Sequence, residues 1–279
     1  MSPFKSILVH LDTSPQSLVR LRLAHQLAEV NDGQVTAMYA SAPFDLLDPL
    51  GLAIDASLAP LLQESEAGRR DRVRALFDAA VASGLRRLNW AELSWSEPLR
   101  AFGQHALYAD LVVLGQYQRD AARPSDVPAD FVVSVLADSG RPGLVLPYIV
   151  GAPATLARRV LVAWKPTRES ARAVTAALPL LRAADRVDIA VWAEEGVAHD
   201  ALALPIEAYL RRHGVTATVH RQGEASRDLG ERLLSFASDL DADLLVMGCY
   251  GHARTREWVL GGVSRTVLES MTLPVLMVH

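Results

Sequence analysis

The second half of this chain repeats the pattern of the first half. Lys5-Ser-Ile-Leu-Val-His-Leu-Asp-Thr-Ser14 is matched by Arg158-Arg-Val-Leu-Val-Ala-Trp-Lys-Pro-Thr167, and Ala109-Asp-Leu-Val-Val-Leu-Gly115 by Ala242-Asp-Leu-Leu-Val-Met-Gly248. Solenoid repeats span only about 20–50 residues, so a repeat of this length indicates a duplicated domain. We therefore expect two domains, 1–150 and 151–279, each large enough to bury its own core.

The apolar segments of both halves predict parallel strands that are buried on both faces. Residues 7–11, 111–114, 160–164 and 244–247 are continuously apolar rather than alternating. Helical patterns lie between them at 17–30, 69–83, 169–182 and 227–240. This order predicts an α/β fold of two tandem doubly wound parallel-sheet domains, each with five strands and four helices. We expect the final strands, 143–147 and 274–279, to pair, so that the halves dock as a pseudo-dimer and neither strand leaves an open edge.

Composition excludes several classes of function. The formal net charge is −4 and half of the residues are hydrophobic, which gives no basic footprint for nucleic acid or an anionic membrane. We expect no signal peptide, because the first six residues lead directly into a five-residue strand pattern rather than an apolar core of 7–15 residues. We also expect no membrane span, because no apolar run of about 18 residues is present. Cys249 is the only cysteine, so no intrachain disulfide can form and a cytoplasmic location is expected.

A glycine-rich segment follows the last-but-one strand of the second half. Gly248 and Gly251 come first, and Gly261-Gly-Val-Ser264 opens an amphipathic segment. Glycines at such a turn let backbone N–H groups approach a ligand closely. At the start of a helix, the N–H groups of Gly262, Val263 and Ser264 would favour a phosphate. The carboxyl ends of parallel strands are also where open α/β sheets bind ligands.

With these spacings the chain resembles the universal stress protein family, whose nucleotide-binding members carry Gly-x2-Gly-x9-Gly-(Ser/Thr) at this place. The resemblance covers the whole chain as a tandem pair. It implies a fold related to the adenine-nucleotide α-hydrolases, a cytoplasmic role in the stress response, and dimerisation through the last strand. It also implies ATP or another adenine nucleotide as the candidate ligand, with no cofactor required for folding.

The two halves depart from the family pattern in opposite ways. In the second half, Gly262 stands where the pattern has Ser or Thr, and Lys165 replaces the aspartate that contacts the adenosine. A lysine cannot accept hydrogen bonds from a base or ribose, although it could reach a phosphate. The first half keeps Asp12, but Gln118 replaces the second glycine and Asp130 aligns with Gly262. We therefore expect nucleotide only in the second half.

Each of these residues also has a structural interpretation. The four glycines could serve only as tight strand-to-helix turns, and Lys165 could be a solvated loop lysine. Asp12 could be a helix N-cap or a turn former. Cys249 lies near a helix N-terminus, which can lower a thiol pKa, whereas a buried lone cysteine is usually inert.

Three classes of function remain on the sequence alone. The first is a regulatory protein that binds a phosphorylated ligand through the second half, and the second is an interaction module without a ligand. The third, a weak ATP hydrolase, lacks an evident nucleophile or general base, so we expect no enzyme. The histidines are scattered without metal-ligand spacing, and His10 is expected to be a hydrogen-bonded core residue. The apolar segment 46–62 could be a short helix on its own domain or a docking surface for a second protomer.

Overall fold

The fold was determined as a computed structural model, which describes residues 4–41, 59–92, 98–118, 126–149, 156–193, 205–224, 228–249 and 262–279. The chain divides into two compact units, unit 1 (residues 1–139) and unit 2 (residues 140–279). The last strand of the first repeat therefore groups with unit 2.

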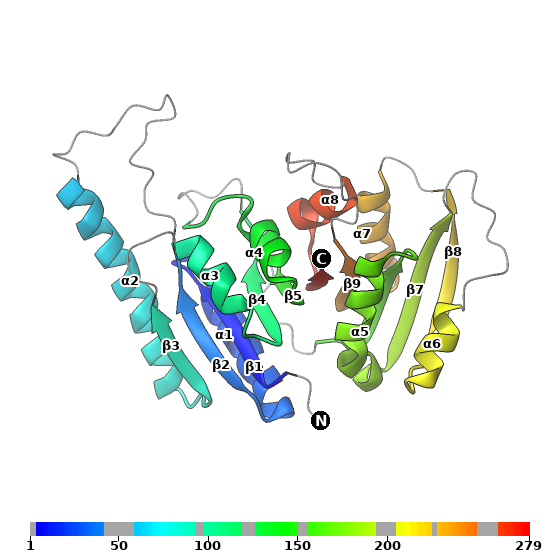
Figure 1. The fold of residues 1–279 in the computed structure, drawn as a ribbon, viewed down its shortest axis with the longest axis horizontal. Coiled ribbons are helices and arrows are strands. Elements are labelled where there is room, and N and C mark those ends of the chain that lie inside the picture. The colour runs from blue at the N-terminus through cyan, green and yellow to red at the C-terminus, as the bar shows by residue number, and fades with distance from the viewer. Residues whose placement is uncertain are drawn as a thin grey trace. The chain divides into compact units, whose positions relative to one another are not determined.

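Unit 1 is a parallel sheet in which strands and helices alternate along the chain (Figure 1). Its elements are β1 (Ser6–Leu11), α1 (Gln16–Asn31), β2 (Gln34–Tyr39), α2 (Ala59–Ala82), β3 (Leu88–Glu92), α3 (Pro98–Ala106), β4 (Leu111–Gly115) and α4 (Phe131–Ser139). The strand order is β3-β2-β1-β4, and every pair is parallel. α2 packs against the outer strand, where the rings of Phe77 and Trp90 lie 5.3 Å apart.

Unit 2 repeats this arrangement. Its elements are β5 (Gly143–Leu146), β6 (Arg159–Trp164), α5 (Arg168–Ala183), β7 (Arg186–Ala193), α6 (Ile206–Arg212), β8 (Thr218–Glu224), α7 (Leu229–Asp239), β9 (Leu244–Gly248), α8 (Gly262–Ser270) and β10 (Val275–Val278). The strand order is β5-β10-β9-β6-β7-β8. Only β5 is antiparallel, with Leu144 opposite Leu276 on β10, which confirms the predicted pairing of the two final strands.

The duplication is visible in the register of the central strands. Ile7 on β1 lies opposite Leu111 on β4, and the equivalent Val160 on β6 lies opposite Leu244 on β9. The apolar residues of these strands are buried on both faces, as their continuous pattern predicts. The predicted α/β class and the alternating order of strands and helices are confirmed.

Segment 46–62 lies almost wholly outside the described residues, except that its last four residues form the start of α2. The predicted helix at 69–83 is confirmed as part of α2, but its predicted start was wrong, because α2 begins ten residues earlier, at Ala59. Residues 60, 61 and 63–65 of this helix are exposed.

The aspartate of the repeated Ala-Asp-Leu motif fixes the start of a central strand in each unit, β1 in unit 1 and β6 in unit 2. Asp110 Oδ2 accepts hydrogen bonds from the backbone N–H groups of Lys5 (2.8 Å) and Ser6 (2.9 Å). Asp243 accepts the equivalent bonds from Arg158 and Arg159, both at 2.9 Å. In both units the aspartate therefore accepts from the N–H of the strand's first residue and from the N–H of the residue before it.

Replacing Asp110 or Asp243 by alanine is expected to lower the free energy of unfolding of its own unit by about 1–2 kcal/mol, since two backbone donors lose a charged acceptor. Urea unfolding, combined with hydrogen exchange to locate the affected unit, would measure this. Asp78→Ala is the control, because the exposed Asp78–Arg74 pair on α2 should contribute only about 0.3–0.5 kcal/mol. Equal losses in all three variants would contradict the assignment.

Candidate functional site

The strand order places one candidate site in each unit. Crossovers reverse direction between β1 and β4 in unit 1, and between β6 and β9 in unit 2. Open α/β sheets bind ligands at the carboxyl ends of the strands at such switch points. Asp12 and Gln116 follow the two central strands of unit 1, and Lys165 and Cys249 follow those of unit 2.

In unit 1 the Asp12 carboxylate is already paired with the protein's own groups. Its Oδ1 lies 2.8 Å from Arg20 Nη2, and accepts hydrogen bonds from the Ser14 N–H (2.9 Å) and the Ser17 hydroxyl (2.9 Å). The Ser14 hydroxyl donates to the same oxygen. Burial opposes ionisation of Asp12, but the Arg20 guanidinium and these hydrogen bonds hold its pKa well below the ordinary value. The turn-former interpretation of Asp12 is confirmed, whereas the N-cap position of α1 is occupied by Pro15, which makes no side-chain capping bond.

Arg20 is the residue that sequence reasoning missed. Its side chain is only 2% exposed, and its Nε donates to the His10 carbonyl at 2.9 Å. A Cβ built at Gly115 would lie 2.2 Å from Arg20 Nη1, so any side chain there would have to displace the end of the Arg20 side chain. Its position in the sequence could have indicated its burial, because Arg20 lies on the buried stripe of α1 with Ser17, Leu21 and Ala24. A charged residue on an apolar stripe indicates a buried partner.

His10 lies beneath this ion pair and is buried to 1% exposure. Its Nε2 is 2.8 Å from the Ala40 carbonyl, and its ring packs against Phe102 (5.5 Å between centroids) and Phe131 (4.6 Å). Its Nδ1 faces Asp12 Oδ2 at 3.8 Å. Burial lowers the pKa of His10 to about 4, against the opposing effect of Asp12. The expected role as a hydrogen-bonded core residue is confirmed.

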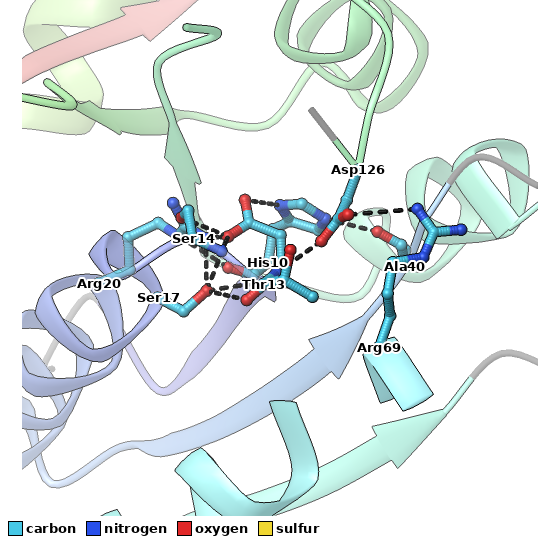
Figure 2. A network of polar contacts seen from close by, with 9 residues as sticks. His10, Thr13, Ser14, Ser17, Arg20, Ala40, Arg69 and Asp126 are labelled. Atoms are coloured by element: carbon cyan, nitrogen blue, oxygen red, sulfur yellow. Dashed lines mark hydrogen bonds and ion pairs between the residues drawn. The ribbon is translucent and has the colours of Figure 1, made fainter. Parts of the chain in front are cut away.

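A second polar cluster adjoins the first (Figure 2). Asp126 Oδ2 accepts a hydrogen bond from the Thr13 N–H at 2.6 Å, and its Oδ1 pairs with Arg69 Nη1 at 3.2 Å. Arg69 also pairs with Glu66 on the same helix. Glu66 in turn accepts hydrogen bonds from the Tyr39 hydroxyl (2.8 Å) and the Ser41 hydroxyl (2.6 Å). Together these contacts tie α2 and the segment before α4 to the carboxyl ends of β1 and β2.

In unit 2 the structure describes only part of the predicted site. Gly251 and Gly261 lie outside the described residues. Lys165 directly follows β6 and has an exposed side chain. At the other end of the segment, α8 begins at Gly262, with Val263 half-buried and Ser264 buried.

Gly248 has a packing role of its own. A Cβ there would lie 2.5 Å from the backbone nitrogen of Ser170 and 2.6 Å from the carbonyl carbon of Glu169. The end of β9 therefore approaches the first turn of α5 too closely for any side chain. This close approach gives Gly248 a packing role that the sequence did not predict, whether or not a ligand binds beside it.

Cys249 is an inert core thiol rather than an activated one. It is 1% exposed, and burial, assisted by the nearby Glu169 carboxylate, raises its pKa to about 12. The thiolate is therefore a negligible species near neutral pH.

The comparisons with known proteins agree with this architecture. A family model described as the universal stress protein family matches residues 157–279. Residues 157–279 are a universal stress protein domain. The matched range contains β6 to β10 and every residue proposed for the site in unit 2.

Solved universal stress proteins share the fold over nearly the whole chain. A universal stress protein from Archaeoglobus fulgidus DSM 4304 matches with a TM-score of 0.69 and 18% identity, covering 98% of this chain and 95% of that one. A putative universal stress protein from Pseudomonas aeruginosa UCBPP-PA14 matches with a TM-score of 0.58 and 15% identity, covering 99% and 94%. The search of curated proteins found no match. The chain thus has the tandem two-domain fold of these universal stress proteins.

Two further observations concern the described part of the chain alone. No helix in it is long and apolar enough to cross a membrane. Nor do its residues bring three or more His, Cys, Asp or Glu side chains together in a way that could hold a metal ion.

Proposed function

We propose that this protein is a stress-response regulator that binds an adenine nucleotide, or another phosphorylated ligand, through unit 2. The observation that carries the proposal is the start of α8 at Gly262, directly after the Gly-x2-Gly-x9-Gly spacing that follows β9. In this proposal the first N–H groups of α8 lie next to the switch point between β6 and β9, where both backbone donors and the helix dipole favour an anion. Gly248, Gly251, Gly261, Gly262, Val263, Ser264 and Lys165 form the proposed site.

In this proposal the protein acts by binding rather than by catalysis. It works in the cytoplasm without a required cofactor, and a homodimer is its expected further assembly. ATP, or another adenine nucleotide, is bound by unit 2 only.

A ligand-free interaction module is the second candidate, and one observation favours it. The buried Glu169 lies against Gly248, where a phosphate would approach the loop. Burial opposes its ionisation, but the hydrogen bond from Arg168 lowers the pKa of this carboxyl, so it is negatively charged near neutral pH. A negative charge there opposes phosphate binding.

Analysis of small molecules released from freshly purified, heat-denatured protein separates the two candidates. Near-stoichiometric ATP, ADP or AMP, identified by chromatography and mass spectrometry, is the result expected from the nucleotide-binding proposal. Protein that releases no nucleotide, and that takes none up from a millimolar solution in equilibrium dialysis, would favour the interaction module.

The glycine loop itself is tested by Gly251→Gln, which copies into unit 2 the residue found at Gln118 in unit 1. The glutamine side chain is expected to crowd the phosphate and lower the affinity for ATP by at least about tenfold, equivalent to about 1.4 kcal/mol. The matched control is Gln118→Gly, which should leave ATP binding unchanged. Equal affinity of the parent and Gly251→Gln would remove the loop from the site.

Gly262→Ser is expected to strengthen ATP binding by about tenfold, since a hydrogen bond to a charged phosphate contributes about 1.5–3 kcal/mol before the cost of ordering the hydroxyl. A Cβ at Gly262 meets no atom within 4 Å among the described residues, so the substitution needs no rearrangement of its surroundings. Isothermal titration calorimetry measures the change, with Gly262→Ala as the control for adding a Cβ without a hydroxyl. A gain shared by both variants would argue against a phosphate contact.

A further inference from the structure

Arg20 spans the place in unit 1 where a ligand would enter the switch point. It starts on α1, donates to the His10 carbonyl at the end of β1, and lies against Gly115 at the end of β4. Among the described residues, Arg20 has the largest of the fully buried side chains. Figure 2 shows Arg20, Ser14 and Ser17 turned toward one another at this strand end. The guanidinium therefore fills the approach to the glycine between the two central strands.

Unit 2 has no equivalent of this ion pair. By the alignment of the two repeats, Lys165 stands at the position of Asp12, and Ala173 at the position of Arg20. Ala173 is buried on α5 and is too short to reach β9 as Arg20 reaches β4. At this strand end, unit 2 therefore replaces both the acidic and the basic residue of the ion pair found in unit 1.

The start of α4 shows a second substitution of the same kind. Asp130 precedes α4 and aligns with Gly262, the first residue of α8. Its Oδ2 accepts a weak hydrogen bond from the Ser134 hydroxyl at 3.4 Å, within the first turn. A carboxylate beside a helix N-terminus interacts favourably with the helix dipole, and it repels another anion there. Unit 1 therefore supplies its own anion where unit 2 leaves a glycine.

We propose that Arg20 closes the strand end of unit 1 to ligands, as the fixed counter-ion of Asp12. Arg20 satisfies the carboxylate that an open site would offer to a ligand hydroxyl or amine, and it occupies the space next to Gly115. Unit 1 is then a ligand-independent unit, and the chain has one ligand site rather than two. The statement that the remaining site is in unit 2 rests on the proposed function, whereas the closure of unit 1 does not.

Chemical rescue of Arg20→Ala tests the closure directly. This variant is expected to leave a cavity lined by the Asp12 carboxylate, the Ser17 hydroxyl and the His10 carbonyl, which should accept a small guanidinium ion. Methylguanidinium at a concentration of about ten times its dissociation constant should raise the Tm of Arg20→Ala by about 3 °C, relative to sodium chloride of equal ionic strength. The parent and the Arg20→Ala/Asp12→Asn double variant should show no such rise. An equal response of all three proteins would overturn the proposal.

Titration with ATP gives a second test that needs no change at Arg20, in case Arg20→Ala does not fold. The Gly251→Gln chain, whose unit 2 site is weakened, is expected to bind ATP at least about tenfold more weakly than the parent, with no contribution from unit 1. If Gly251→Gln bound ATP and the further substitution Asp12→Asn removed that binding, unit 1 would contain an open site, and the closure would be overturned. Failure of the proposed function has a different signature, because the parent itself would then bind no ATP while the rescue by methylguanidinium persists.

Discussion

Replacing Asp12 by asparagine is expected to lower the free energy of unfolding of unit 1 by about 3–5 kcal/mol, the range found when one partner of a buried ion pair is removed. Asparagine keeps the shape of the side chain but leaves the Arg20 guanidinium, 2% exposed, without its carboxylate. The cost is large because a buried cation that loses its counter-ion cannot recover the hydration it gave up on folding. Urea unfolding measures the loss, and hydrogen exchange locates it in unit 1.

The internal repeat supplies a matched control for this experiment. Lys165→Ala changes the equivalent position in unit 2, where the side chain is exposed, and should alter the free energy of unfolding by no more than about 0.5 kcal/mol. A double variant, Asp12→Asn with Arg20→Met, should be more stable than the sum of the two single losses predicts, because both ends of the pair are removed together. Additive losses would show that Asp12 and Arg20 are not coupled.

Much of the fold could be predicted from the sequence because the central strands encode their burial locally. The runs at 7–11 and 244–247 contain no exposed face that needs polar residues, so their continuous apolar pattern is sufficient. The internal repeat strengthened the prediction, since the same strand or helix pattern occurs at the equivalent positions of both halves. The start of α2 was not predictable in this way, because residues 60, 61 and 63–65 are exposed and give little periodic signal of burial.

The candidate site was less predictable because its contacts join residues that are far apart in the sequence. The spacing of the glycines indicated which loop to examine, but the partner of Asp12 is set by the fold. Arg20 is buried only because β4 ends in Gly115, which leaves room for the guanidinium. Likewise Asp126 meets Arg69 across 57 positions of the chain. No local sequence pattern predicts such pairs, although a charged residue on the buried stripe of α1 indicates that a buried partner exists.

His10 is expected to make unit 1 sensitive to acid over a defined range of pH. In the unfolded chain its imidazole binds a proton at the ordinary pKa of 6.5, whereas burial keeps the folded imidazole neutral down to about pH 4. Between these values the unfolded state binds more protons, so stability is full above pH 6.5 and falls as the pH is lowered toward 4. The loss reaches about 3 kcal/mol at pH 4. In the folded state Asp12 stays charged throughout this range, because its pKa lies well below its ordinary value of 3.8.

His10→Gln isolates this contribution, because glutamine can still donate to the Ala40 carbonyl but does not titrate. Free energies of unfolding of the parent and His10→Gln should run parallel above pH 6.5, and the parent should lose about 3 kcal/mol more than the variant by pH 4. His105→Gln, at an exposed position on α3, should keep the pH dependence of the parent. Curves for the parent and His10→Gln that remain parallel down to pH 4 would mean that the buried imidazole gains its proton without opposing the fold. The aromatic contacts with Phe102 and Phe131 would then not define a low-dielectric site, and the acid sensitivity of unit 1 would have to come from its carboxylates.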